Sequence, residues 1–138
     1  MSTNKILKSI KEKEIEYIDL RFTDPKGKLQ HVTMDKTIVD EEMLNEGIFF
    51  DGSSIAGWKA INESDMILKP DLNREIIDPF TSHNTLVLFC DVLDAVKKTP
   101  YERDPRSTAK KAEYYLKKSG IGDKAFFGPE AEFFVFDD

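Results

Sequence analysis

The chain contains few of the residues that often reveal a function at once, beginning with cysteine and histidine. It has one cysteine, Cys90, in 138 residues. A lone cysteine forms no disulfide within the chain, and the apolar run around Cys90 predicts a buried thiol instead of a reactive one. The two histidines, His31 and His83, lie far apart and in no spacing typical of metal ligands. We therefore expect neither a disulfide framework nor a histidine–cysteine metal site.

Common signals for nucleotides, membranes and nucleic acids are also missing. The sequence contains neither a G-x-G-x-x-G pattern nor a Walker A pattern. The N-terminus lacks an apolar signal core and no apolar run is long enough to cross a membrane, so we expect a cytoplasmic protein. The net charge is −6 and no dense cluster of lysine and arginine occurs, which argues against a nucleic-acid partner.

What the chain does contain is a series of helix and strand patterns that predicts an α+β fold. Its length fits one domain with room for the beginning of a second. Residues 3–14 have the apolar spacing of an amphipathic helix, and residues 15–34 alternate around a Pro/Gly turn, as in a β-hairpin. Residues 85–92 are apolar on both faces, which predicts a central strand. Together these patterns predict a small mixed sheet covered by helices.

The remaining patterns predict two more helices and two more strands. The helices are residues 39–46, which end at Gly47, and a longer one that opens at Asp104-Pro105 and stops at Gly120. The strands are residues 66–68 and residues 125–136. The last strand is so rich in phenylalanine that it needs neighbouring strands to cover it. We therefore interpret the chain as a fragment that ends inside a second domain.

Residues 49–58, FFDGSSIAGW, form the most informative segment. Gly52 and Gly57 allow backbone conformations that side chains disfavour, so the segment predicts a tightly shaped loop. Such a loop can hold the carboxylate of Asp51 in a defined place. The alternative is a surface turn beside a packed tryptophan.

Two further segments carry a family resemblance together with this loop. KAINESDMILKPD follows it at residues 59–71, and FGPEAEFFVFDD closes the chain at residues 127–138. In this order the three segments resemble glutamine synthetase of the bacterial type. The sequence departs from the family at Ala56, where glycine is usual, and at Ala131, where many relatives have proline. The resemblance implies a β-grasp N-terminal domain in residues 1–103, and a linking helix with the first catalytic strand in residues 104–138.

The resemblance also implies roles for individual residues. Asp51 matches the family's ammonium-binding and proton-accepting acid, and Asp65 matches a second acid near that pocket. Ser54 belongs to the substrate-binding loop, and Trp58 is expected to wall the site beside the nucleotide. Each has a simpler alternative: a turn or helix-cap aspartate for Asp65, a turn hydroxyl for Ser54 and core packing for Trp58.

Glu130 and Glu132 are the predicted metal ligands. Side chains two residues apart on a strand share one face, so both carboxylates can address one site. Mg²⁺ and Mn²⁺ prefer such oxygen ligands. Spacing alone favours the alternative of two solvent-facing glutamates on an edge strand, and it is the Gly-Pro-Glu-x-Glu-Phe-Phe context of the family that favours metal.

The family's reaction joins ammonia to glutamate through γ-glutamyl phosphate, with cleavage of ATP. Its active sites lie between adjacent subunits in stacked hexameric rings, so the loop with Asp51 is expected to serve a neighbouring subunit. ATP is bound mainly by catalytic-domain residues that this chain lacks, so the chain alone is expected to be inactive. Two alternatives stay open: a γ-glutamyl ligase for a larger amine, and a non-catalytic β-grasp interaction module.

Overall fold

The computed structural model describes residues 3–58 and 64–137. The chain divides into two compact units, Met1–Thr108 and Ala109–Asp138. Each unit is described by itself below. Residues 59–63, which include part of the second motif, lie outside the described residues.

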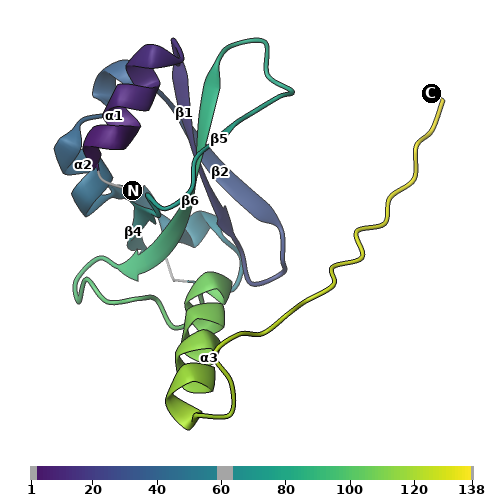
Figure 1. The fold of residues 1–138 in the computed structure, drawn as a ribbon. Coiled ribbons are helices and arrows are strands. Elements are labelled where there is room, and N and C mark those ends of the chain that lie inside the picture. The colour runs from purple at the N-terminus through teal and green to yellow at the C-terminus, as the bar shows by residue number, and fades with distance from the viewer. Residues whose placement is uncertain (1–2, 59–63, 138) are drawn as a thin grey trace. The chain divides into compact units, whose positions relative to one another are not determined.

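The first unit is built around one mixed sheet (Figure 1). Along its main path the strands have the order β2-β1-β6-β4-β3, and β5 pairs with β6. β1 runs parallel to β6, whereas the other pairs are antiparallel. The strands are β1 (Tyr17–Thr23), β2 (Leu29–Asp35), β3 (Ile48–Asp51), β4 (Asp65–Pro70), β5 (Ile76–Ile77) and β6 (Thr85–Asp94).

The central position of β6 follows from its composition. Residues 85–88 are buried on both faces of the sheet, as expected for a strand with neighbours on each side. The predicted central strand is therefore confirmed, and so is the hairpin of β1 and β2. Cys90 lies in the same strand and is buried, and this burial raises the pKa of its thiol far above the usual range. The two-residue strand β5 was not predicted, because so short a segment carries no periodicity.

Two short helices, α1 (Thr3–Glu12) and α2 (Glu41–Glu46), cover one face of the sheet (Figure 1). α1 buries Ile6 and Ile10 in the core. α2 starts two residues later than predicted, after the short 3₁₀ helix η1 (Lys36–Ile38). Asp40 caps it by accepting a hydrogen bond from Met43 N at 2.8 Å. Its end requires glycine, because Gly47 has φ 84° and a Cβ there would lie 2.3 Å from Leu68 O.

The third helix, α3 (Pro105–Ser119), begins where the sequence predicted. Asp104 caps it: its Oδ2 accepts hydrogen bonds from Ser107 N at 3.0 Å and Ser107 Oγ at 2.7 Å. The chain leaves the helix at Gly120, whose φ of 72° is typical of a glycine C-cap.

The predicted strand at residues 125–136 is wrong for this structure. Residues 124–137 form neither helix nor strand, and their phenylalanines, such as Phe126 and Phe134, are exposed. A strand forms only when another strand satisfies its backbone hydrogen bonds. No strand within the described residues pairs with this segment.

Candidate functional site

Asp51 and Asp65 face each other across two paired strands. β3 ends at Asp51, β4 begins at Asp65, and the antiparallel register makes these two residues direct partners. Opposite residues of an antiparallel pair point to the same face, with Cβ atoms about 4.5–5.5 Å apart. Both side chains are exposed. The structure therefore brings together two acids that are fourteen positions apart in the sequence.

The charge of Asp51 is stabilised by its neighbour two residues on. Asp51 Oδ1 accepts hydrogen bonds from Ser53 Oγ at 2.6 Å and from Ser53 N at 2.9 Å. The Ser53 hydroxyl, followed by the Ser53 N–H, lowers the pKa of the Asp51 carboxyl. Like charges placed opposite each other repel. The two exposed carboxyl groups lie side by side on one face of the strand pair.

The acid pair lies at an edge of the sheet. β3 is the last strand in the sheet order, and its side chains alternate between the two faces. Ile48 and Phe50 pack against the core, whereas Phe49 on the face of Asp51 is 68% exposed. At Phe49 and Asp51 this face is therefore open to solvent, whereas Ile67 of β4, opposite Phe49, is buried.

The loop after Asp51 begins with a 3₁₀ turn, η2 (Gly52–Ser54). Gly52 N donates to Ser64 O at 2.7 Å, and a Cβ at Gly52 would lie 2.2 Å from the sulfur of Met66. Only glycine therefore fits at this position without displacing a buried neighbour. Ser54 is exposed at the end of the turn. Ser54 was predicted as a site residue and Ser53 was not, although an i, i+2 spacing from aspartate is the ordinary signal of such a turn.

Trp58, at the end of the loop, is packed in the hydrophobic core. It is 6% exposed and stacks on Phe22 at 5.7 Å between ring centroids, with Phe50 and Tyr101 at its edges. This is the packing alternative stated above. A contact between Trp58 and a nucleotide stays a prediction, and the burial of the ring does not support it.

Glu130 and Glu132 are exposed and lie in the segment without strands. Their carboxylate oxygens have the right chemistry for Mg²⁺ or Mn²⁺, which take six or more oxygen ligands. Within residues 3–58 and 64–137, no group of three or more His, Cys, Asp or Glu side chains is placed to hold a metal ion. The two glutamates thus fit such an ion as part of a ligand set.

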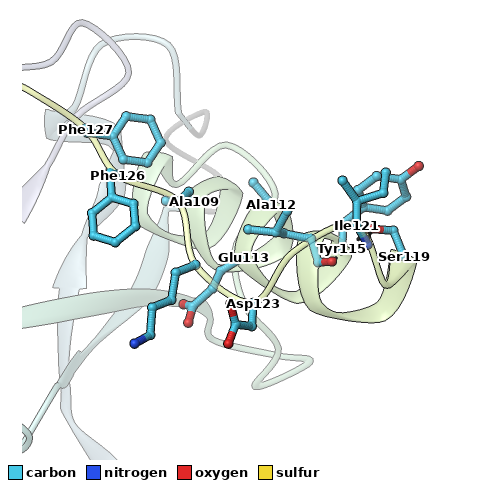
Figure 2. A pocket seen from close by; sticks show the side chains of 12 residues that line it. Ala109, Ala112, Glu113, Tyr115, Ser119, Ile121, Asp123, Phe126 and Phe127 are labelled. Carbon is cyan, nitrogen blue, oxygen red and sulfur yellow. Dashed lines mark hydrogen bonds between the residues drawn. The ribbon is translucent and has the colours of Figure 1, made fainter.

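The second unit contains a pocket of about 710 Å³ between its part of α3 and the segment that follows (Figure 2). Ala109, Ala112 and Leu116 of the helix line it together with Phe126 and Phe127. Ala109 and Ala112 are exposed, so this face of the helix is only lightly covered. The pocket is apolar and contains none of the predicted site residues.

Two protein-family models match this sequence. Residues 14–95 match the family model described as "Glutamine synthetase, beta-Grasp domain". The chain belongs to the glutamine synthetase family. Residues 102–138 also match "Glutamine synthetase, catalytic domain". The family resemblance and the α+β, β-grasp fold are thereby confirmed, whereas the domain boundary between residues 103 and 104 stays a prediction.

Curated relatives cover nearly all of this chain. It is 65% identical to "Glutamine synthetase" of Rhizobium meliloti over 137 residues, which are 99% of this chain and 29% of the relative. It is 60% identical to "Glutamine synthetase" of Azorhizobium caulinodans, with the same coverage of 99% and 29%. The chain therefore spans about three tenths of the length of these relatives.

A solved structure supports the fold. "CryoEM Plasmodium falciparum glutamine synthetase" matches with a TM-score of 0.76 and 24% identity, over 87% of this chain and 23% of that chain. At this identity the likeness shows the fold alone.

Among the described residues, none of the helices has the length and apolar character needed to span a membrane.

Proposed function

We propose that this chain is the N-terminal part of an enzyme that ligates ammonia to glutamate with cleavage of ATP. In this reaction the glutamate side chain is first phosphorylated, and ammonia then attacks the acyl carbon of γ-glutamyl phosphate and displaces phosphate. The observation that carries the proposal is the exposed pair of Asp51 and Asp65 on opposite strands. The membership of the chain in the glutamine synthetase family supports it.

The acid pair supplies what the second step needs. In water at pH 7 ammonia is mostly ammonium, which has no lone pair to attack a carbon atom. An ionised carboxylate binds the cation by charge and then accepts its proton, which releases the nucleophile. Asp51 is assigned both tasks, because Ser53 keeps its carboxyl ionised by lowering its pKa. Asp65 strengthens the local negative potential, and Ser54 lies in the same loop as a substrate-binding hydroxyl.

The proposed enzyme is a homo-oligomer of stacked hexameric rings, in which the Asp51 loop of one subunit completes the active site of the next. Two features support this arrangement: β3 is an edge strand, and its acid-bearing face is open to solvent. Asp51 and Glu130 of one polypeptide then belong to different active sites. Glutamate and ATP bind mainly to the catalytic domain, so the 138-residue chain alone has no ligase activity.

Glu130 and Glu132 are proposed to hold Mg²⁺ or Mn²⁺ in the complete enzyme. Such an ion, when bound, neutralises the charge of the phosphoryl group that is transferred. The two glutamates position it through their carboxylate oxygens. Other ligands come from outside the described residues.

The experiment that tests the proposal is Asp51→Ala in the complete enzyme. We expect turnover with ammonium to fall by about 10²–10⁴-fold, the usual contribution of a general base. Formation of acyl phosphate, followed as glutamate-dependent release of phosphate from ATP, should be partly retained. Normal KM for ammonium and normal turnover in this variant would contradict the assigned role.

Asp35→Ala is a matched control, because the local geometry of Asp35 is the same. Asp35 Oδ1 accepts hydrogen bonds from Thr37 N at 2.8 Å and Thr37 Oγ1 at 2.7 Å, and the side chain is exposed. This variant should keep full activity. Assays with methylamine in place of ammonium separate the proposed enzyme from a ligase for larger amines, which would prefer methylamine.

A further inference from the structure

We propose that Arg103 is a positioning residue for the loop of residues 52–58, and that it keeps this loop in the shape that ammonium use requires. The inference rests on the proposed function, because the importance of the loop comes from Asp51. Arg103 lies 46 positions from Gly57 in the sequence. We infer this role from the hydrogen bond to Gly57 in the folded structure, because no sequence pattern indicated it.

The loop is held at two ends by different means. At the first end, β3 pairs with β4 and Gly52 N donates to Ser64 O at 2.7 Å. At the second end, Arg103 Nη1 donates to Gly57 O at 2.8 Å and lies 3.5 Å from Trp58 O. A charged donor makes a stronger hydrogen bond than a neutral one. The second end is therefore held by the packed ring of Trp58 and by one hydrogen-bonding side chain from outside the loop, Arg103.

Backbone hydrogen bonds connect the second end to the acid. Trp58 N donates to Ile55 O at 3.2 Å, and Ile55 N donates to Gly52 O at 3.1 Å. Ser53, which donates to Asp51, lies inside the turn that the bond from Ile55 N to Gly52 O closes. A displacement at Gly57 and Trp58 is thus passed along two consecutive turns to the residues that orient the carboxylate.

The conformation of Gly57 makes an anchor necessary. Its φ is 88°, and among the described residues no atom beyond its chain neighbours lies within 4 Å of the position of a Cβ. Nothing packs tightly against this residue from the side of a Cβ. Glycine loses more conformational freedom on folding than any other residue, so a specific contact stabilises an ordered Gly57. The bond from Arg103 to its carbonyl oxygen is such a contact.

Arg103 itself comes from a firmly held segment. On one side, Tyr101 N donates to Val92 O at 2.9 Å and the Tyr101 ring contacts Trp58 edge-on at 5.7 Å. On the other side, Asp104 is fully buried and caps α3. The guanidinium is therefore carried by a backbone fixed to β6 and to the first turn of α3. Arg103 can hold Gly57 in place because its own backbone is held by these contacts.

The test uses the complete enzyme with Arg103→Met, which keeps most of the stem and removes the donors, and Arg103→Lys, which keeps a charged donor. Arg74→Met is the matched control, since Arg74 is an exposed arginine that follows β4. Two quantities are measured: amide hydrogen exchange in peptides covering residues 52–58, and the steady-state constants for ammonium, glutamate and ATP. Exchange in β6 reports whether each variant is folded.

We expect Arg103→Met to raise exchange at residues 55–58 and KM for ammonium, each about tenfold, the size of one charged hydrogen bond. The constants for glutamate and ATP, and the exchange of β6, should stay unchanged. Arg103→Lys should restore most of both properties, and Arg74→Met should match the wild type. A purely structural role would not separate ammonium from the other substrates.

Unchanged exchange at residues 55–58 in folded Arg103→Met would overturn the proposal, and so would faster exchange with unchanged ammonium kinetics. If Arg103→Met does not fold, Arg103→Gln takes its place. The proposal is supported when Arg103→Gln raises exchange and KM for ammonium while Arg103→Lys stays at the level of Arg74→Met. It is overturned when Arg103→Gln also stays at that level. Failure of the proposed function has a different signature. The wild-type enzyme would then make no glutamine, while the exchange data would still show whether Arg103 holds the loop.

Discussion

At the scale of single residues, the loop near Asp51 depends on atoms that fit with little room to spare. Gly52 is buried, and a Cβ there would meet the sulfur of Met66 at 2.2 Å and Ser64 O at 3.0 Å. Met66 is itself fully buried. The absence of a side chain at Gly52 is therefore a packing requirement, and a freely bending hinge is not needed to explain it.

We predict that Gly52→Ala lowers the free energy of unfolding of the 138-residue chain by about 1–3 kcal/mol, the usual cost of overpacking. Urea unfolding followed by circular dichroism measures this difference. Gly128→Ala is the control, because no atom of the described residues other than its chain neighbours lies within 4 Å of a Cβ at that position. Equal stabilities for the two variants would show that the neighbours of Gly52 yield more easily than the structure indicates.

At the scale of elements, the start of α3 depends on Asp104. The carboxylate is fully buried, its Oδ2 serves both donors of Ser107, and its Oδ1 accepts from Arg106 N at 3.2 Å. Arg106 in turn forms an ion pair with Asp91 of β6 at 2.7 Å. The first turn of the helix is thereby attached to the sheet by both a cap and a charge contact. This explains why the first turn belongs to the same compact unit as the sheet.

Removing this cap should be costly. We predict that Asp104→Ala destabilises the chain by about 2 kcal/mol or more, because it removes an N-cap and leaves buried donors without an acceptor. Asp104→Ser should recover part of the loss, since a hydroxyl also caps a helix. Urea midpoints of the two variants and of exposed Asp123→Ala measure the effect. A loss no larger than that of Asp123→Ala would rule out this role of Asp104.

At the scale of the whole molecule, several carboxyl groups have a pKa that is lower in the native state. Asp19 is the most buried of them. Burial alone raises its pKa, but hydrogen bonds from His31, Thr33 and Arg21 outweigh this effect and lower it. The other lowered groups among the described residues are Asp24, Asp35, Asp51, Glu75, Asp78 and Glu113.

The pH dependence of stability follows from the sign of these shifts. A carboxyl group with a lowered native pKa binds fewer protons in the native state than in the unfolded state, so acid favours unfolding. The stabilisation is complete above the unfolded value near 3.8 and is lost as the pH falls through the lower native value. We predict that the urea midpoint of the chain falls steadily below about pH 5. Asp19→Asn should weaken this dependence, and an equal slope in both proteins would contradict the contribution of Asp19.

Much of the fold was predictable because it depends on local pattern. The hairpin, the central strand and the helix that starts after Asp104 each follow from periodicity or capping within a short segment, and the loop and metal motifs identified the family. The strand at residues 125–136 could not be judged in this way. A strand exists only with a partner, and its apolar residues do not show whether one is present.

The sequence by itself determined the hairpin, the central strand and the start of the third helix, which family the chain belongs to and which residues carry charge in its glycine loop. Only the tertiary structure decided that Asp51 lies opposite Asp65, that Ser53 orients the acid, and that Arg103 holds Gly57 from 46 positions away. The physical reason is that periodicity acts over a few residues. Strand register and bonds to backbone carbonyls, in contrast, depend on how distant segments pack around one shared core.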